Sequence, residues 1–199
     1  AIALVLGTPF YVVFGALSDH LGRKAVMMAG FALAVVGYIP IYQAMDRVVT
    51  PQGAPVEEGR GETGSFKRYE DESVVRLLET PQPNGQTATK TEILLPGRDK
   101  LALIALIFVQ ILFATMAYGP IAAFLVEVFP TKIRYTSLSV PYHFANGVFG
   151  GCSPFVATWL GALTGSKLAG IYYPMFLAGL TLGVGLVFLK ETKGKRLRD

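Results

Sequence analysis

The sequence predicts an all-α membrane protein that carries one polar insert, and three observations support this. Of its 199 residues, 52% are hydrophobic and 16% are charged, whereas soluble domains have about 25% charged residues. The charges are unevenly placed, because 18 of the 32 lie within residues 46–100. Outside that segment the chain contains five long runs without Asp, Glu, Lys or Arg. Such a pattern excludes an ordinary soluble domain, and a single cysteine excludes a disulfide scaffold.

The five runs cover residues 1–18, 25–45, 101–126, 135–166 and 168–189. A helix needs about 20 apolar residues to cross the hydrocarbon of a bilayer, so each run predicts a transmembrane helix. The first run opens in hydrophobic register without Met, and it lacks the flanks of a signal peptide. We therefore expect a piece of a longer protein. The fourth run is longer than one span needs, and we expect its start at the interface and a turn over residues 161–166.

This reading divides the chain into four segments. Residues 1–45 form two transmembrane helices joined by a loop at 19–24, residues 46–100 form the polar insert, residues 101–189 form three transmembrane helices, and residues 190–199 form a basic tail. Nine of the ten Lys and Arg residues outside the insert lie on one side of this alternating arrangement. The positive-inside rule then predicts a multi-pass protein of the cell (inner) membrane, with a cytoplasmic C-terminus and an extracytoplasmic insert. The basic residues flank helices rather than accompany stacking aromatics, so nucleic-acid binding is not expected.

The insert contains weak and conflicting local signals. Residues 46–64 are rich in Gly and Pro, so we expect them to be mobile. Asn84-Gly85 favours a small hairpin, while a short helix over residues 70–79 is an equal alternative. Neither would bury enough surface to form a domain alone. The simplest interpretation is a tolerated loop extension, and the alternative is a substrate gate or a partner surface.

The most informative motif covers residues 15–24 and reads G-A-L-S-D-H-L-G-R-K. Gly15 permits a close approach between helices, and Gly22 permits a tight turn. Asp19 faces Arg23 and Lys24 across a loop that is very short. A carboxylate at the edge of the membrane is costly unless it is paired, so we expect these charges to interact.

Residues 15–24 resemble the loop motif G-x-L-[AS]-D-[RH]-x-G-R-[KR] of the major facilitator superfamily. Residues 127–134 (E-V-F-P-T-K-I-R) are similar to the E-x-F-P-x-x-x-R signature after the tenth helix of its sugar porters and metabolite/proton symporters. Residues 190–194 (K-E-T-K-G) are similar to the P-E-T-K-G end of the last helix, with Lys190 in place of Pro. The order of the motifs implies helices eight to twelve, in the C-terminal bundle of a twelve-helix transporter. The flanking R-Y-T-S and G-P-I-A-A-F resemble the metabolite/proton symporter group more than the sugar porters.

The resemblance implies a cytoplasmic gate. Arg23, Glu127, Arg134 and Glu191 would form an ion-pair cluster that Asp19 supports, closed in the outward-open state and separated in the inward-open state. The alternative is that these charges only fix topology, which we favour for Lys193 to Arg198. The predicted gate residues are Gly15, Asp19, Gly22, Arg23, Lys24, Glu127, Arg134 and Glu191.

Polar residues inside the predicted helices are candidates for substrate binding. Ser139, His143, Asn146 and Gly150 share one face of the fourth helix if it is α-helical throughout. A polar stripe in lipid should face the bundle interior or a water-filled cavity, although hydrogen bonding between helices would explain it equally well. The substrate-binding candidates are Gln110, Tyr118, Ser139, Tyr142, His143 and Asn146. No span has a central Asp or Glu, so a proton-coupling carboxylate within these helices is not expected.

The leading hypothesis is a transmembrane transporter that moves a small polar metabolite, an organic acid or zwitterion, by proton-coupled alternating access. A sugar porter and a non-transporting sensor of the same fold are the alternatives. Cys152 and Ser153 are potential nucleophiles, but no G-x-S-x-G or H-E-x-x-H occurs, so an enzyme is not expected. We expect no catalytic residues, metal site or cofactor. The expected partners are the substrate, protons, the lipid bilayer and an N-terminal half of about seven more helices.

Overall fold

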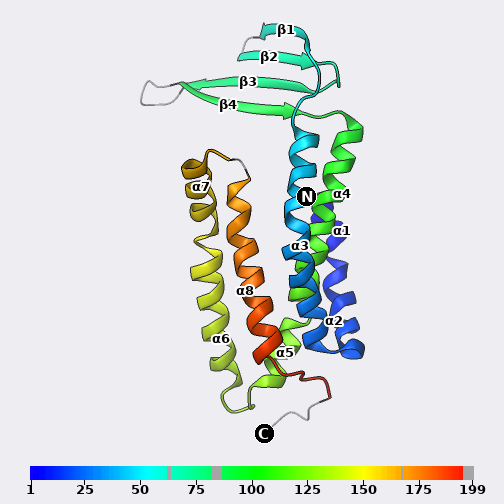
Figure 1. The fold of residues 1–199 in the computed structure, drawn as a ribbon, viewed down its shortest axis with the longest axis vertical. Helices are drawn as coiled ribbons and strands as arrows, with labels where there is room; N and C mark the ends of the chain where they lie inside the picture. The colour runs from blue at the N-terminus through cyan, green and yellow to red at the C-terminus, as the bar shows by residue number, and fades with distance from the viewer. Residues whose placement is uncertain (62–63, 82–86, 167, 195–199) are drawn as a thin grey trace. The chain divides into compact units, whose positions relative to one another are not determined.

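The computed structural model describes residues 1–61, 64–81, 87–166 and 168–194 of the chain. It divides into two compact units, a helical unit (Ala1–Tyr42 and Ile107–Asp199) and an insert unit (Gln43–Leu106). The boundary between the units falls within helices α3 (Arg23–Val49) and α4 (Gly97–Tyr118), which Figure 1 labels. The second transmembrane helix thus continues four residues past the predicted boundary at residue 45, and α4 begins four residues before the predicted start at 101.

The helical unit consists of short and long helices in sequence. Besides α3 and α4 it contains α1 (Ile2–Gly7), α2 (Pro9–Leu21), α5 (Ile121–Val128), α6 (Arg134–Phe144), the π-helix η1 (Ala145–Gly150), α7 (Ser153–Thr164), the 3₁₀ turn η2 (Ala169–Ile171) and α8 (Tyr172–Phe188). A break at Gly119-Pro120 separates α4 from α5, because proline removes one backbone donor and clashes with the preceding turn.

Among the described residues, four stretches are long and apolar enough to cross a membrane: Ile2–Leu21, Arg23–Val49, Gly97–Val128 and Ala169–Phe188. They correspond to the first, second, third and fifth predicted helices. The fourth predicted helix is divided into α6, η1 and α7 and is not among these four, so its crossing of the membrane stays a prediction. Its final turn is shorter than expected, because α7 continues to Thr164 and ends at Gly165 in a left-handed conformation (φ 67°).

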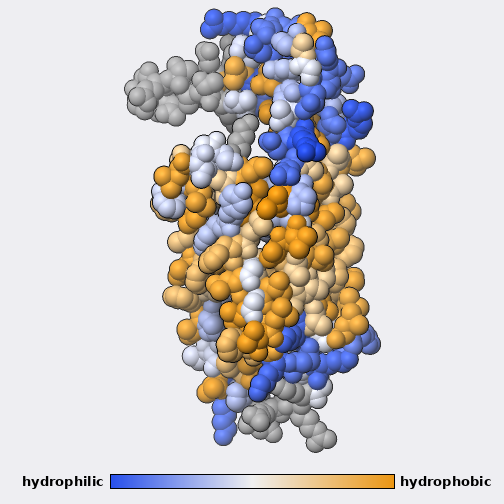
Figure 2. Space-filling model, in the orientation of Figure 1, coloured by the Kyte–Doolittle hydropathy of each residue, from blue (hydrophilic) through white to orange (hydrophobic). Residues whose placement is uncertain are grey.

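Close contacts at glycine hold the helices of this unit together. A Cβ on Gly30 of α3 would lie 2.9 Å from the Cβ of Met116 in α4. Met27 and Met28 of α3 form a buried cluster with Phe124 of α5. Small residues let helix backbones approach, which is how helices associate where no hydrophobic effect drives them together. The outward surface is largely hydrophobic over α6 and α8, as Figure 2 shows, which suits contact with lipid.

The insert unit contains a four-stranded antiparallel sheet in the order β1-β2-β3-β4 (Figure 1). Its strands are β1 (Pro55–Gly61), β2 (Gly64–Tyr69), β3 (Val74–Pro81) and β4 (Thr87–Leu94). In the central register Phe66 pairs with Arg76, and Arg76 pairs with Glu92 on its other side.

The sheet corrects the expectations for the insert. A helix over residues 70–79 is wrong, because the β-branched pair Val74 and Val75 lies in a strand bonded on both sides. The β3–β4 hairpin forms, while its Asn84-Gly85 lies outside the described residues. Within the segment expected to be mobile, residues 46–49 end α3 and residues 55–61 form β1, so these parts have regular secondary structure. A single hairpin would bury too little, and four paired strands supply the missing contacts.

Candidate functional site

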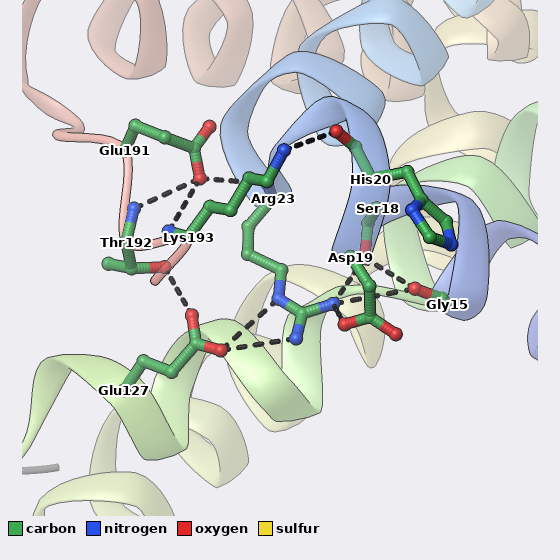
Figure 3. A network of polar contacts seen from close by, with 9 residues as sticks. All are labelled: Gly15, Ser18, Asp19, His20, Arg23, Glu127, Glu191, Thr192 and Lys193. Atoms are coloured by element: carbon green, nitrogen blue, oxygen red, sulfur yellow. Dashed lines mark hydrogen bonds and ion pairs between the residues drawn. The ribbon is translucent and has the colours of Figure 1, made fainter. Parts of the chain in front are cut away.

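Arg23, the first residue of α3, lies at the centre of a polar network (Figure 3). Its guanidinium contacts Asp19 of α2, with 2.5 Å between Nη1 and Oδ1, and Glu127 of α5, with 3.1 Å between Nη2 and Oε1. The side chains of Arg23 and Glu127 are 12% and 17% exposed, whereas that of Asp19 is 56% exposed. Removing one partner of an ion pair leaves the other charge unpaired, and the cost rises as that charge is more shielded from water. Loss of the Arg23–Glu127 pair is therefore expected to cost more than loss of Arg23–Asp19.

Uncharged groups complete the shell around the guanidinium. Arg23 Nη1 donates to the hydroxyl of Ser18 at 2.6 Å and to the carbonyl of Gly15 at 3.4 Å. Ser18 is fully buried, and its hydroxyl donates to the same Gly15 carbonyl at 2.6 Å. Arg23 thus engages the last turns of α2 as well as α5. We call Asp19, Arg23, Glu127 and these immediate partners, together with the tail residues described next, the Arg23 cluster.

The segment after α8 joins the cluster at two points. The hydroxyl of Thr192, which is 2% exposed, donates to Glu127 Oε2 at 2.5 Å. Glu191 accepts hydrogen bonds from the backbone N–H groups of Arg23 at 2.8 Å and Lys24 at 3.1 Å. These are the first two amides of α3, where unpaired N–H groups and the helix dipole favour an anion. Glu191 therefore caps α3 from the far end of the chain.

The protonation of Glu191 reflects this position. Desolvation would raise the pKa of its carboxyl group, but backbone N–H groups of Lys193, Arg23, Thr192 and Lys24 bond to the charged form and lower the pKa below its ordinary value. Gly22 leaves room for the carboxylate, since a Cβ there would lie 2.5 Å from Glu191 Oε2. Its φ of 111° is also a conformation that favours glycine.

Two lysines each bind the C-terminal end of a helix. Lys24 Nζ donates to the carbonyl of Leu186 in the last turn of α8 at 2.8 Å. Lys193 Nζ, from the segment after α8, donates to the carbonyl of His20 at the end of α2. Cations near a helix C-terminus satisfy its free carbonyls and complement its dipole. Lys193 therefore makes a specific tertiary contact, which its place in a basic tail did not predict.

Most of the predicted gate residues come together in this network, and one does not. Arg134 begins α6, its Nε donates to the carbonyl of Phe129 at 3.2 Å, and its Nη2 is buried without a hydrogen-bond partner in the described part of the chain. The structure thus does not show the expected pairing of Arg134 with the carboxylates. Ser18 and Thr192 were missed, because a neutral hydroxyl carries no charge signal. Their places next to Asp19 and Glu191 within the motifs were the available clue.

A second site lies where α4, α8 and η1 meet. A cavity of about 340 Å³ is lined by the polar residues Tyr118, Asn146, Ser153 and Thr181 and by apolar and aromatic residues that include Phe31 and Phe149. The Tyr118 hydroxyl and Asn146 Oδ1 are 3.5 Å apart, in a long hydrogen bond. We call this cavity the Asn146 pocket. Its described lining carries no Asp, Glu, Lys or Arg.

Two of the six predicted substrate-binding residues line the pocket, and a third lines only an adjoining cavity. Tyr118 and Asn146 line the pocket, and with Tyr142 they also line the adjoining cavity of about 220 Å³. Gln110, Ser139 and His143 line neither cavity, and the ring of His143 packs against Tyr142 with 5.7 Å between centroids. The predicted polar stripe assumed one continuous α-helix. Because η1 adds a π-turn between His143 and Gly150, the 3.6-residue period does not continue through the segment and the stripe is interrupted.

The described residues contain no group of three or more His, Cys, Asp or Glu side chains that could hold a metal ion. The polar residues of the Arg23 cluster are suited to ion pairing and hydrogen bonding, and those of the Asn146 pocket are suited to hydrogen bonding. Such groups bind and orient small molecules and lock helix ends.

Comparison with known proteins identifies the family. A family model described as "Sugar (and other) transporter" matches residues 88–199, more than half of the chain. The inner membrane metabolite transport protein YhjE of Escherichia coli (strain K12) is 32% identical over 104 residues, which is 52% of this chain and 23% of that protein. A putative metabolite transport protein of Haemophilus influenzae is 47% identical over 83 residues, covering 41% of this chain and 18% of the relative.

The alpha-ketoglutarate permease of Escherichia coli (strain K12) is 25% identical over 185 residues, which cover 93% of this chain and 31% of that protein. The chain thus spans between about a fifth and a third of the length of these curated relatives. No solved structure matches it. The family match, the apolar helices and the named relatives together place the chain in the sugar (and other) transporter family, as a multi-pass membrane protein of the major facilitator superfamily.

Proposed function

We propose that this chain is the C-terminal bundle of a carrier that moves a small polar metabolite by alternating access, with the Arg23 cluster as its cytoplasmic gate. The observation that carries the proposal is the position of Arg23, whose side chain joins the ends of α2, α3 and α5. The helix α5 is far from α2 and α3 in sequence, so the cluster holds its end against theirs only while the ion pairs are intact. Separation of the pairs into water would release the ends and favour an open state.

The orientation of this gate follows from the charges. Arg23, Lys24, Lys132, Arg134, Lys190 and Lys193 flank the helices at the ends that we assign to the cytoplasm. The insert unit then lies on the extracytoplasmic side. A facing bundle of the same carrier would complete the central cavity. The short coverage of the relatives supports a longer protein.

The substrate would contact the Asn146 pocket, where neutral hydrogen-bonding groups stand beside aromatic rings. Binding pockets for small molecules combine these two features. Relatives named for alpha-ketoglutarate and for proline/betaine support an organic acid or a zwitterion. Coupling to a proton is part of the proposal, and His143 on α6 is the residue of this bundle that we propose for it.

Uptake by the complete transporter in proteoliposomes tests the proposal. We expect flux of one member of a panel containing alpha-ketoglutarate, proline, glycine betaine and a hexose, and we expect an imposed inward proton gradient to increase it. The Asp19→Asn variant should insert normally, and its flux should be about three- to tenfold lower, because Arg23 loses one of its two ion pairs.

Glu58→Gln is the matched control, since it removes a carboxylate from the exposed pair with Lys67 in the insert. Unchanged uptake by Asp19→Asn would contradict the gate. Absence of flux for the whole panel would favour a sensor, and flux that ignores the proton gradient would remove the symport part.

A further inference from the structure

We propose that Gly151 is a positioning residue for substrate recognition. By permitting the π-turn η1, it would set the rotation of α6 and present Asn146 to Tyr118 in the Asn146 pocket. The inference rests on the proposed function, because it assigns a role within the proposed binding site. It concerns a residue that contacts no substrate and that acts through the backbone.

The hydrogen bonds around η1 show what Gly151 does. Its N–H donates to the carbonyl of Asn146, five residues back, at 3.0 Å. The next amide, that of Cys152, donates to Val148 at 3.1 Å, so the carbonyl of Gly147 is passed over by both. One extra residue is thereby accommodated in this turn. Single π-turns inside α-helices are rare and often occur at functional sites.

The passed-over carbonyl explains why position 151 requires glycine. A Cβ built on Gly151 would lie less than 3.0 Å from the oxygen of Gly147, a distance at which one of the two must move. For Gly147 in η1 and Gly183 in α8, a Cβ would meet nothing within 4 Å outside the nearby backbone of its own helix. Gly147, Gly151 and Gly183 are all exposed in this chain. Alanine at Gly147 or Gly183 therefore contacts no other element, which makes these two positions suitable controls.

Contacts on both sides of the turn link it to the pocket. Near the start of η1, Asn146 Oδ1 accepts the long hydrogen bond from Tyr118 of α4. Near its end, the carbonyl of Phe149 accepts a hydrogen bond from the hydroxyl of Tyr173 in α8 at 3.0 Å. The second contact fixes the side of the turn that leads into α7, whereas the first depends on how α6 is rotated.

Loss of the π-turn would change that rotation. Removing one residue from the turn count rotates the preceding helix by about 100°, the angle per residue of an α-helix. With α7 held in place, Asn146 would leave Tyr118, and the face of α6 that includes Pro141 and Tyr142 would leave the adjoining cavity. An alanine at position 151 favours that outcome, because it clashes with the π geometry and prefers a regular helix.

The test compares Gly151→Ala with Gly147→Ala and Gly183→Ala in the complete transporter, because neither control residue lines the Asn146 pocket or the adjoining cavity. We expect Gly151→Ala to raise the KM for the transported substrate about three- to tenfold with little change in the maximal rate, as for the loss of a neutral hydrogen bond. The two control variants should leave KM unchanged. Combining Gly151→Ala with Asn146→Ala should raise KM no further than the stronger single variant, because both remove the same contact.

A spectroscopic distance separates this inference from the proposed function. Spin labels on the exposed positions Val140 of α6 and Phe176 of α8 should report a shift of several ångströms in Gly151→Ala and none in the controls. An unchanged distance, additive effects on KM, or an unchanged KM beside a shifted distance would each overturn the inference while leaving transport intact. Absence of uptake by the unmutated protein would overturn the proposed function and the inference together.

Discussion

The Arg23 cluster and the Asn146 pocket are built in opposite ways within the same helical unit. The cluster gathers charges around Arg23 and Glu127, the two that are most shielded from water, and bonds them at 2.5–3.4 Å to partners from four parts of the chain. The pocket is neutral, its Asn146 is exposed, and one 3.5 Å contact joins its two best-placed polar groups. A gate must hold by itself in one state and let go in another, so its interactions are strong and self-contained. A binding surface keeps its polar groups available for a ligand.

The largest effect is expected from removing the centre of the cluster. Arg23→Ala leaves Glu127 in a poorly solvated position without its cation, at a cost of about 3–5 kcal/mol for a buried pair. We expect uptake by the complete transporter to fall more than tenfold and the unfolding temperature in detergent to decrease. Uptake assays and thermal unfolding followed by intrinsic fluorescence measure the two effects.

Lys67→Ala is the control for that variant. Lys67 and Glu58 form an ion pair at 2.8 Å in which both side chains are about half exposed (45% and 53%). A surface pair contributes about 0–1 kcal/mol, so stability should barely change. Equal losses from Arg23→Ala and Lys67→Ala would contradict the distinction between a shielded gate and an exposed surface.

An intermediate effect is expected at the turn that admits Glu191. Gly22→Ala places a Cβ 2.5 Å from Glu191 Oε2 in a backbone conformation with φ 111°. Backbone strain of about 1–3 kcal/mol then adds to the displacement of the carboxylate from the start of α3. Gly165→Ala is the matched control, because its φ is also positive (67°) but a Cβ there meets nothing within 4 Å. Thermal unfolding should show a larger decrease for Gly22→Ala, and equal decreases would remove the role of Glu191 as a cap.

The smallest effect is a pH dependence that the cluster should show and the neutral pocket should not. The folded structure lowers the pKa of Glu191, so its stabilising contribution is complete above the ordinary glutamate pKa of about 4.3 and disappears as pH falls through the lowered value. Unfolding temperatures measured from pH 7 down to pH 3 should decrease less steeply in Glu191→Gln than in the unmutated protein. Asn146→Ala should keep the unmutated slope, and parallel slopes for all three proteins would contradict the assignment.

The sequence predicted the cluster far better than the pocket, and the reason lies in the kind of signal. Unpaired charge at a membrane edge is costly, so the positions of Asp19 and Arg23 along the chain were enough to predict that they interact. The part played by Glu127 was implied by the resemblance to the superfamily. The pairing of Arg134 failed, because the direction of a side chain depends on the turn between α5 and α6. The hydroxyls of Ser18 and Thr192 carried no comparable signal, since serine and threonine are common in helices and loops alike.

The insert shows the same limit in a different form. Its strands are short, and the hydrophobic run at Val74–Val75 with Leu77–Leu78 suits a helix or a strand about equally. Pairing of β3 with both β2 and β4 decides between them, and those pairings join residues separated by intervening turns. Local sequence cannot specify such partners. For this reason it favoured a single hairpin or a short helix, whereas the structure has a four-stranded sheet.

By itself the sequence determined that this is a membrane protein, which segments are long apolar helices, where the charged motifs stand and which superfamily they resemble. These properties follow from composition and from spacing along the chain, because burial in lipid tolerates few charges. The tertiary structure alone decided that Glu191 caps α3, that Lys24 binds the end of α8 and Lys193 the end of α2, and that Asn146 in η1 contacts Tyr118. Each of these depends on backbone geometry or on contacts between distant segments, which no local pattern encodes.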